Sequence, residues 1–224
     1  MNLLELKDKL PPALYTVLET QGIKELRPCQ EKAINAGVLE GKSLLVCSPT
    51  GSGKTQVAEY AALASILQKK SKAVYIVPLR ALATEKYKDF VKRYGHLCRI
   101  AMSSGDLDSA DNYLAGYDLI IVTAEKLDSL LRHQAPWVKG IATMIVDEIH
   151  LLQDTTRGPV LEILITLLRD ILPSLQIIGL SATIGNPEEL AAWLDAELVL
   201  DTWRPIPLKK GIYCNGKLEF YTTG

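Results

Sequence analysis

Several features that mark specialised classes of protein are scarce or missing in this sequence. No apolar run approaches the roughly 20 residues that span a bilayer. The amino terminus, MNLLELKDKLPP, also lacks the basic start and long apolar stretch of a secretory signal. The four cysteines lie far apart without a CxxC pair, which favours free thiols over a zinc site or a redox motif. We therefore expect a cytoplasmic protein with no membrane partner.

The sequence also lacks an excess of charge of either sign. It has 25 Lys and Arg against 26 Asp and Glu, a formal net charge of -1. Nucleic-acid-binding domains usually carry a clear basic excess, so any such function must be argued from local motifs. What is present is ordinary globular composition, with 48% hydrophobic residues in a chain of 224. One large domain with a tail fits these values best.

Short apolar runs alternate with stretches of helical periodicity along most of the chain. This alternation predicts an α/β fold, with a mostly parallel sheet and helices on both faces. Ligands of such sheets bind beyond the carboxyl ends of the strands, where functional residues are therefore expected. The irregular stretch 201–224 is typical of a short strand and a linker. The predicted strands are 43–47, 73–77, 98–102, 118–122, 142–146 and 176–180, and the predicted helices are 56–68, 81–94, 124–132 and 160–170.

A phosphate-binding loop follows the first predicted strand. Residues 48–55 read SPTGSGKT and lead directly into a helical stretch, which is the context that such a loop requires. Gly51 and Gly53 let the backbone turn its amides toward phosphates at the positive end of a helix. Lys54 would reach the β and γ phosphates, and the Thr55 hydroxyl would coordinate magnesium. The strict pattern has glycine where this chain has Ser48, and the alternative is a glycine-rich turn that binds nothing.

Two adjacent carboxylates follow a later strand. Asp147 and Glu148 end the run ATMIV, and neighbouring side chains at a strand end point to different faces. Asp147 would hold magnesium through its water shell, and Glu148 would orient and deprotonate the attacking water. A solvated strand end is the alternative. Ser181, in the segment SAT that ends the next strand, could bond these carboxylates or His150, although SAT could equally start a turn or cap a helix. His150 alone is more often a packed histidine than a catalytic one.

The order and spacing of SPTGSGKT, DEIH and SAT resemble motifs I, II and III of superfamily 2 helicases. Further segments resemble the Ski-two-like group, and within it the archaeal fork helicases of the Hjm family. The resemblance covers nearly the whole chain. The further segments are PLRALATEK at 78–86, SGD at 104–106, TAEKLDSLLR at 123–132, RG at 157–158, WLD at 193–195 and DTWRP at 201–205.

This resemblance implies a RecA-like P-loop NTPase domain over 1–200, with adenine-recognition helices in 1–40 and a linker at 201–224. Gln30 matches the glutamine that reads the adenine edge. Arg27 stands where relatives often have an aromatic residue, so a stacked guanidinium is one candidate for the group on the adenine ring.

The resemblance implies roles for the remaining positions as well. ATP would be bound by Gln30, Thr50, Gly51, Ser52, Gly53, Lys54, Thr55, Ser181 and Thr183, with catalysis by Lys54, Asp147, Glu148 and His150 and Mg²⁺ held by Thr55 and Asp147. Nucleic acid would be bound by Arg80, Gly105, Asp106, Thr123, Glu125, Lys126 and Arg157, beside an alanine at 124 that replaces a common serine or proline.

The expected function is that of the ATP-binding motor domain of a helicase, acting on single-stranded or forked DNA from 3′ to 5′ in fork repair or recombination. The alternatives are an RNA helicase of the same superfamily and a nucleotide-dependent binding module without unwinding. Small-molecule kinases and GTPases share the loop, but the guanine-reading segment NKxD is missing. Only 41 residues follow Thr183, too few for the second RecA-like domain that such motors use. We therefore expect a fragment that is nearly inactive alone.

Overall fold

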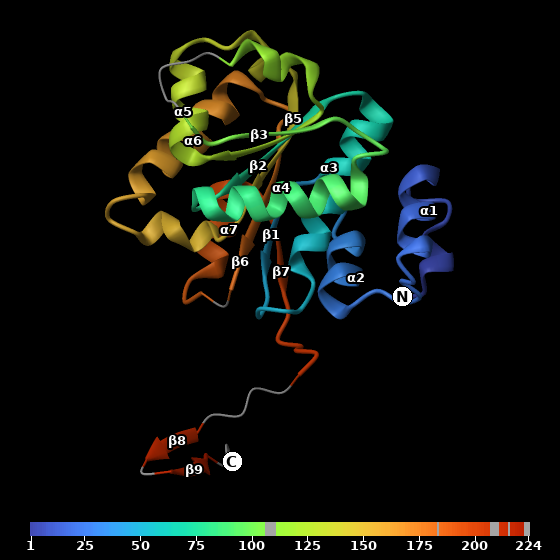
Figure 1. The fold of residues 1–224 in the computed structure, drawn as a ribbon, viewed down its shortest axis with the longest axis vertical. Helices are drawn as coiled ribbons and strands as arrows, with labels where there is room; N and C mark the ends of the chain where they lie inside the picture. The colour runs from blue at the N-terminus through green and yellow to red at the C-terminus, as the bar shows by residue number, and fades with distance from the viewer. Residues whose placement is uncertain (106–110, 183, 207–210, 215, 222–224) are drawn as a thin grey trace.

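Seven parallel strands form the centre of the molecule in a computed structural model (Figure 1). The structure describes residues 1–105, 111–182, 184–206, 211–214 and 216–221. The strand order is β3-β4-β2-β5-β6-β1-β7, and every pairing is parallel. The strands are β1 Leu44–Cys47, β2 Lys72–Val77, β3 Ile100–Ser103, β4 Leu119–Thr123, β5 Ile141–Val146, β6 Gln176–Ser181 and β7 Glu197–Leu200.

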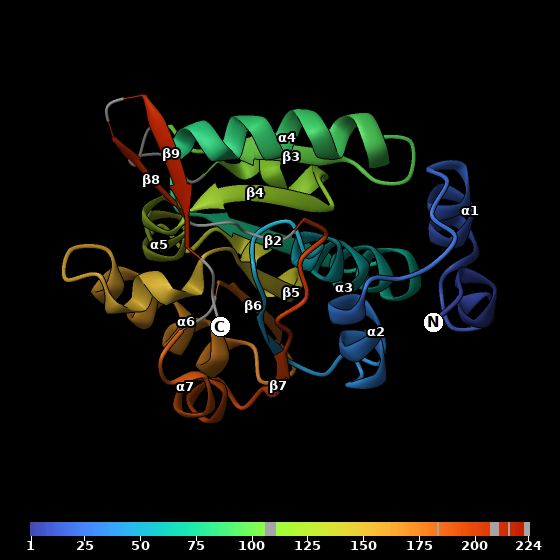
Figure 2. The same ribbon diagram turned by 90° about the horizontal axis from the view of Figure 1, so that it is seen from below.

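Helices cover both faces of this sheet (Figure 2), so the predicted fold class is confirmed. Helices α1 to α4 enclose one hydrophobic core with the sheet, and α5 to α7 enclose a second core on the other face. The helices are α1 Pro12–Thr20, α2 Pro28–Asn35, α3 Lys54–Lys69, α4 Arg80–Tyr94, α5 Ala124–Arg132, α6 Gly158–Ile171 and α7 Pro187–Leu194, with short 3₁₀ turns at Leu3–Leu6, Asn112–Gly116, Pro136–Gly140 and Ile149–Gln153.

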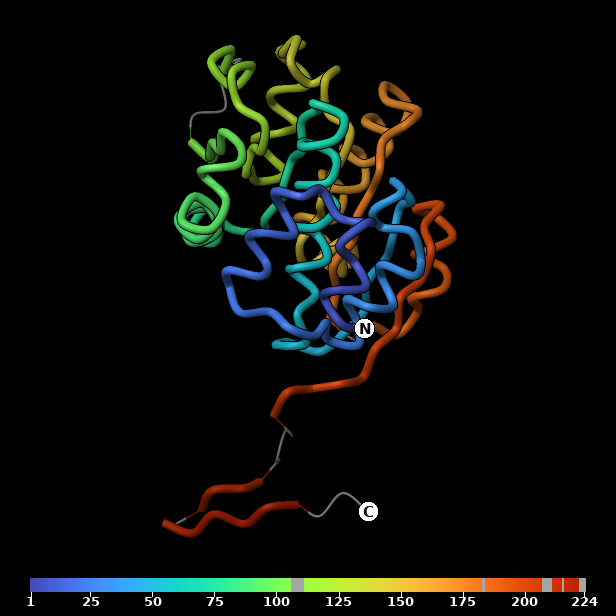
Figure 3. Tube along the Cα trace, turned by 90° about the vertical axis from the view of Figure 1, so that its right-hand side faces the viewer, coloured from blue at the N-terminus to red at the C-terminus, as the bar shows by residue number. Residues whose placement is uncertain are grey.

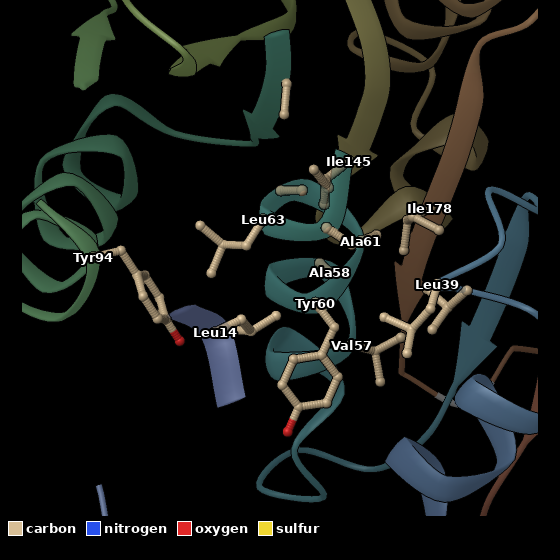
Figure 4. Close-up of a cluster of buried hydrophobic side chains, with 14 of the residues drawn as sticks. Leu14, Leu39, Val57, Ala58, Tyr60, Ala61, Leu63, Tyr94, Ile145 and Ile178 are labelled. Carbon is tan, nitrogen blue, oxygen red and sulfur yellow. The ribbon is translucent and has the colours of Figure 1, made fainter. Parts of the chain in front are cut away.

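Helix α3 is almost entirely enclosed. Its sequence KTQVAEYAALASILQK is rich in alanine, which is the best helix former and lets neighbouring elements approach closely. Ala61 of the helix lies toward Ile145 of β5 and Ile178 of β6, whereas the Tyr60 ring points away from these strands within the same core (Figure 4). Packing on all sides fixes this helix, and with it the loop that precedes its first residue.

The carboxyl-terminal segment leaves the body of the molecule. Beyond β7, a two-stranded antiparallel hairpin forms from β8 Gly211–Cys214 and β9 Lys217–Phe220, and it stands apart from the sheet (Figures 1 and 3). All four cysteines are free thiols, as the spacing indicates, and only Cys214 of the hairpin is exposed. Among the described residues, none of the helices combines the length and apolar character that crossing a bilayer requires.

Candidate nucleotide-hydrolysis site

The loop 48–55 joins β1 to α3 at the carboxyl edge of the sheet. Two of its glycines take left-handed backbone angles, with φ of 82° at Gly51 and 99° at Gly53. A Cβ atom at position 53 would lie 2.5 Å from Nε2 of Gln30, which is closer than real Cβ contacts. The left-handed backbone angle therefore favours glycine at position 53, and any side chain there would also displace the Gln30 amide.

The departure from the strict loop pattern at Ser48 has a structural use. Ser48 and Ser52 are both fully buried, and their hydroxyl oxygens lie 2.8 Å apart. The backbone N–H of Ser48 also donates to the carbonyl of Ser181 at the end of β6, over 3.2 Å. These bonds brace the loop across its base and against the neighbouring strand.

Lys54 is the first residue of α3, and its side chain folds back over the loop. The residue is buried, and its ammonium donates to the carbonyl of Ser48 over 3.4 Å. Thr55 follows in the first helical turn, where N–H groups have no partners within the helix. Thr50 and Gly51 are exposed at the tip. The loop thus joins a lysine cation, helix N–H groups and a threonine hydroxyl in one place, a combination suited to binding phosphate.

Gln30 and Arg27 connect α2 to this loop. The side-chain amide of Gln30 is buried and already bonded, because its Nε2 donates to the Gly53 carbonyl and to Gln56 while its Oε1 accepts from the N–H of Arg27. Gln30 would therefore have to exchange partners to read a base edge. The Arg27 guanidinium donates to the Gly51 carbonyl over 2.6 Å.

No role was predicted for Trp203, which lies beside this loop. Its ring is 5.9 Å from the Arg27 guanidinium carbon. The segment that carries it is anchored by Lys32, whose ammonium donates to the Leu200 carbonyl and lies 3.1 Å from a carboxylate oxygen of Asp201. Residues just after β7 are therefore held against α2, next to Arg27 and the loop 48–55.

The two carboxylates after β5 point into different surroundings. Asp147 faces the α3 and α4 side of the sheet, where its Oδ2 accepts from the Tyr75 hydroxyl at 3.0 Å and lies 3.7 Å from the Lys86 ammonium. Burial, and then the Asp147 carboxylate, raise the pKa of Tyr75 well above its usual range, so that this hydroxyl keeps its proton. These two partners of Asp147 were not anticipated from the sequence.

Glu148 turns the chain away from β5, since it has a left-handed φ of 52°. Its carboxylate lies 3.4 Å from Nδ1 of His150, and the same ring nitrogen is 3.3 Å from the Ser181 hydroxyl. The predicted contact between Ser181 and His150 is therefore present. A polar chain runs from the end of β6 to a carboxylate that is half-exposed and able to contact solvent water.

The donor groups at this edge suit magnesium. Within the described ranges, no group of three or more His, Cys, Asp or Glu is arranged to hold a metal ion. Mg²⁺ needs no such cage, because it is usually bound through one or two protein oxygens together with substrate phosphates and water. Thr55 and Asp147 could supply hard oxygen ligands of that kind.

Some residues predicted to contact nucleic acid lie at the same edge. Arg80 is the exposed first residue of α4, and its guanidinium donates to the Gly105 carbonyl over 3.4 Å. Glu125 and Arg157 line a small pocket together with Asp147. Arg157 also donates to Asp154, whose pKa is lowered to about 2 chiefly by the backbone N–H groups of residues 157 and 156.

Two other predicted contacts face the interior. Thr123 is buried and caps α5 by accepting from the N–H of Lys126. Lys126 is only 1% exposed, and its ammonium lies 3.1 Å from Asp111. It would reach a ligand only by giving up that ion pair. Asp106 and Thr183, also predicted as site residues, lie outside the described residues.

Comparison with known proteins agrees with this geometry. The chain is 51% identical over 209 residues to the ATP-dependent DNA helicase Hel308 of Pyrococcus horikoshii, which covers 93% of this chain and 29% of that protein. It is 52% identical over 214 residues to Hel308 of Methanocaldococcus jannaschii, covering 92% of this chain and 18% of that protein. The chain thus spans less than a third of the length of these curated relatives.

A solved structure has the same RecA-like architecture. The DUF1998 helicase MrfA, crystallised bound to DNA, matches with a TM-score of 0.73 at 26% identity, over 86% of this chain and 30% of that one. Residues 27–190 match the DEAD/DEAH box helicase family, from Arg27 through both carboxylates to α7. This chain, which is similar to the Ski-two-like Hel308 proteins over nearly its whole length, belongs to the DEAD/DEAH box helicase family.

Proposed function

We propose that this chain is the ATP-binding motor domain of a DNA helicase that moves 3′ to 5′ along one strand and acts at forked DNA in repair or recombination. One observation carries the proposal: the phosphate loop before α3 and the carboxylates after β5 lie at the same edge of one sheet. The relatives are named ATP-dependent DNA helicases, which supports DNA as the nucleic acid along which this motor moves.

The reaction is phosphoryl transfer from ATP to water. Lys54 and the first N–H groups of α3 bind the β and γ phosphates and stabilise the charge that develops on them. Thr55 and Asp147 would hold Mg²⁺, which would supply positive charge to neutralise the phosphates. Glu148 accepts the proton of the attacking water. His150 holds the Glu148 side chain over 3.4 Å, and the Ser181 hydroxyl in turn contacts the same ring nitrogen of His150 at 3.3 Å.

Base recognition involves Arg27 and Gln30. The Arg27 guanidinium stacks on the adenine ring, as Arg does on flat π systems. Gln30 reads the adenine edge after releasing Gln56, which is the one side-chain partner of its amide.

Residues 1–200 form the RecA-like unit, and 201–224 lead toward a second RecA-like domain of the same polypeptide. An arginine finger from that domain is typically worth about 10³ to 10⁵ in rate. Chain 1–224 therefore binds Mg·ATP but hydrolyses it slowly. Arg80, Gly105 and Arg157 contribute one wall of the groove for a single strand, through backbone contacts that read no bases.

Steady-state ATPase measurement tests the proposal. Chain 1–224 and a longer protein containing the second domain are assayed alone, with single-stranded DNA and with single-stranded RNA. We expect strong stimulation by DNA in the longer protein only. Equal stimulation by RNA would favour an RNA helicase, and full activity of chain 1–224 alone would contradict the two-domain mechanism.

A further inference from the structure

Tyr75 lies in the middle of β2 and reaches a carboxylate at the end of β5. Tyr75 pairs with Ile145 in the parallel ladder, so Asp147, two residues later, lies on the same face of the sheet. The tyrosine side chain spans this offset, and its hydroxyl ends 3.0 Å from Oδ2 of Asp147. The ring itself is fully buried.

Helix α4 fixes the ring in place. Phe90 meets the Tyr75 ring edge-on, with centroids 5.3 Å apart and an interplanar angle of 82°. One turn earlier, the Lys86 ammonium lies 5.5 Å from the centre of the same ring and 3.7 Å from the same carboxylate oxygen. The hydroxyl therefore has one direction in which to donate.

The Asp147 carboxylate is consequently held from the inside of the protein. Its Oδ2 accepts from the Tyr75 hydroxyl and lies near the Lys86 ammonium, and its Oδ1 accepts from the N–H of Glu148 at 3.1 Å. A carboxylate can accept about four hydrogen bonds, so capacity remains toward solvent, where its side chain is 12% exposed. These contacts fix the orientation of the carboxylate, and so the direction in which its remaining lone pairs face solvent.

We propose that Tyr75 is a positioning residue that orients Asp147 for the water shell of Mg²⁺, an inference that rests on the proposed function. Hydrogen-bond partners of metal-binding carboxylates fix their orientation and raise metal affinity. Such a partner need not touch ATP, Mg²⁺ or the attacking water.

The alternative is that the Tyr75 hydroxyl is merely a buried polar group that found an acceptor. Tyr60 of α3, labelled in Figure 4, argues against this, because its hydroxyl is also buried and has no hydrogen-bond partner among the residues that the structure describes. This core therefore tolerates a tyrosine hydroxyl without an acceptor. Tyr60 also provides a matched control, since Tyr60→Phe removes the same atom from the same hydrophobic core.

The test measures binding without turnover. Chain 1–224 is mixed with a fluorescent, non-hydrolysable ATP analogue and titrated with Mg²⁺, for wild type, Tyr75→Phe, Tyr60→Phe and Asp147→Asn. Mn²⁺ binding in the same mixtures, followed by electron paramagnetic resonance, gives a direct second readout. Thermal melting checks that each variant is folded.

We expect Tyr75→Phe to raise the Mg²⁺ concentration at half-saturation by about tenfold, while affinity for the analogue in EDTA stays unchanged. Tyr60→Phe should match wild type. If Tyr75→Phe also matches wild type while Asp147→Asn shifts the metal dependence, the positioning role is wrong and the proposed role of Asp147 stands. If Asp147→Asn shifts nothing, the proposed magnesium site itself is wrong.

Discussion

Two carboxylates beneath helix α4 have similar partners but different access to solvent. Glu59 of α3 accepts two bonds from the Arg93 guanidinium, at 2.6 and 2.7 Å, and one from the Tyr94 hydroxyl at 2.6 Å. Asp147 likewise has a cation and a tyrosine from α4 and β2. Glu59 is enclosed, whereas Asp147 lies at the edge of the sheet. The same kinds of contact therefore tie α3 to α4 at Glu59 and leave a carboxylate partly open to solvent at Asp147.

The largest effect is expected on ATP turnover, at the sheet edge where Glu148 follows Asp147. Glu148→Gln should lower ATP turnover by about 10²- to 10⁴-fold, because an amide cannot accept the proton of the attacking water. Binding of Mg·ATP should persist. Single-turnover hydrolysis and calorimetric titration in the longer protein separate the two quantities. Turnover near the wild-type rate would show that another group is the base.

At the enclosed Glu59 carboxylate, the expected effect is on the free energy of unfolding. Arg93→Met leaves the Glu59 carboxylate buried without its cation, which should lower the free energy of unfolding by about 3–5 kcal/mol. Urea denaturation measures this loss. Lys86→Met is the matched variant at the sheet edge, because it removes the cation beside Asp147, and its effect should be below about 1 kcal/mol because solvent reaches that site. Equal losses for both variants would contradict the stated difference in solvent access between Glu59 and Asp147.

The smallest effect is expected for a hydroxyl that has no partner. Tyr60→Phe removes a buried polar atom that makes no hydrogen bond within the described part of the chain, so it should leave the free energy of unfolding unchanged or raise it by about 1 kcal/mol. Tyr94→Phe removes a hydroxyl that donates to Glu59 and should be destabilising. Denaturation midpoints for the two variants give the comparison. A clear loss of stability for Tyr60→Phe would mean that its hydroxyl has a partner after all.

Sequence patterns located the strands and helices that carry strong periodicity. All six predicted strands and all four predicted helices are present, with bounds that agree within two residues. Strand β7 was missed because ELVL is a short edge strand with exposed positions. One short strand was predicted within 201–224, whereas the structure has the two-stranded hairpin β8–β9, in which all positions are exposed. Strands are recognised in a sequence by apolar residues at buried positions, and these short strands have few or none.

The candidate site was partly predictable for a different reason. Loops that follow parallel strands must meet at one edge, so Lys54 and Asp147 could be placed together from their order in the chain. The contact from Tyr75 to Asp147 joins residues 72 positions apart and depends on the direction of one side chain. Likewise, nothing in the residue type of Lys126 distinguishes a groove-lining lysine from one that is paired inside the protein.

The most direct test of the central claim is calorimetric titration of chain 1–224 with Mg·ATP, for wild type and Lys54→Ala. In the proposed mechanism, Lys54 supplies the charge that neutralises the β and γ phosphates. We predict saturable binding by wild type at one site and no measurable binding by a folded Lys54→Ala variant. Equal affinity in the two proteins would contradict the assignment of this loop as the nucleotide site.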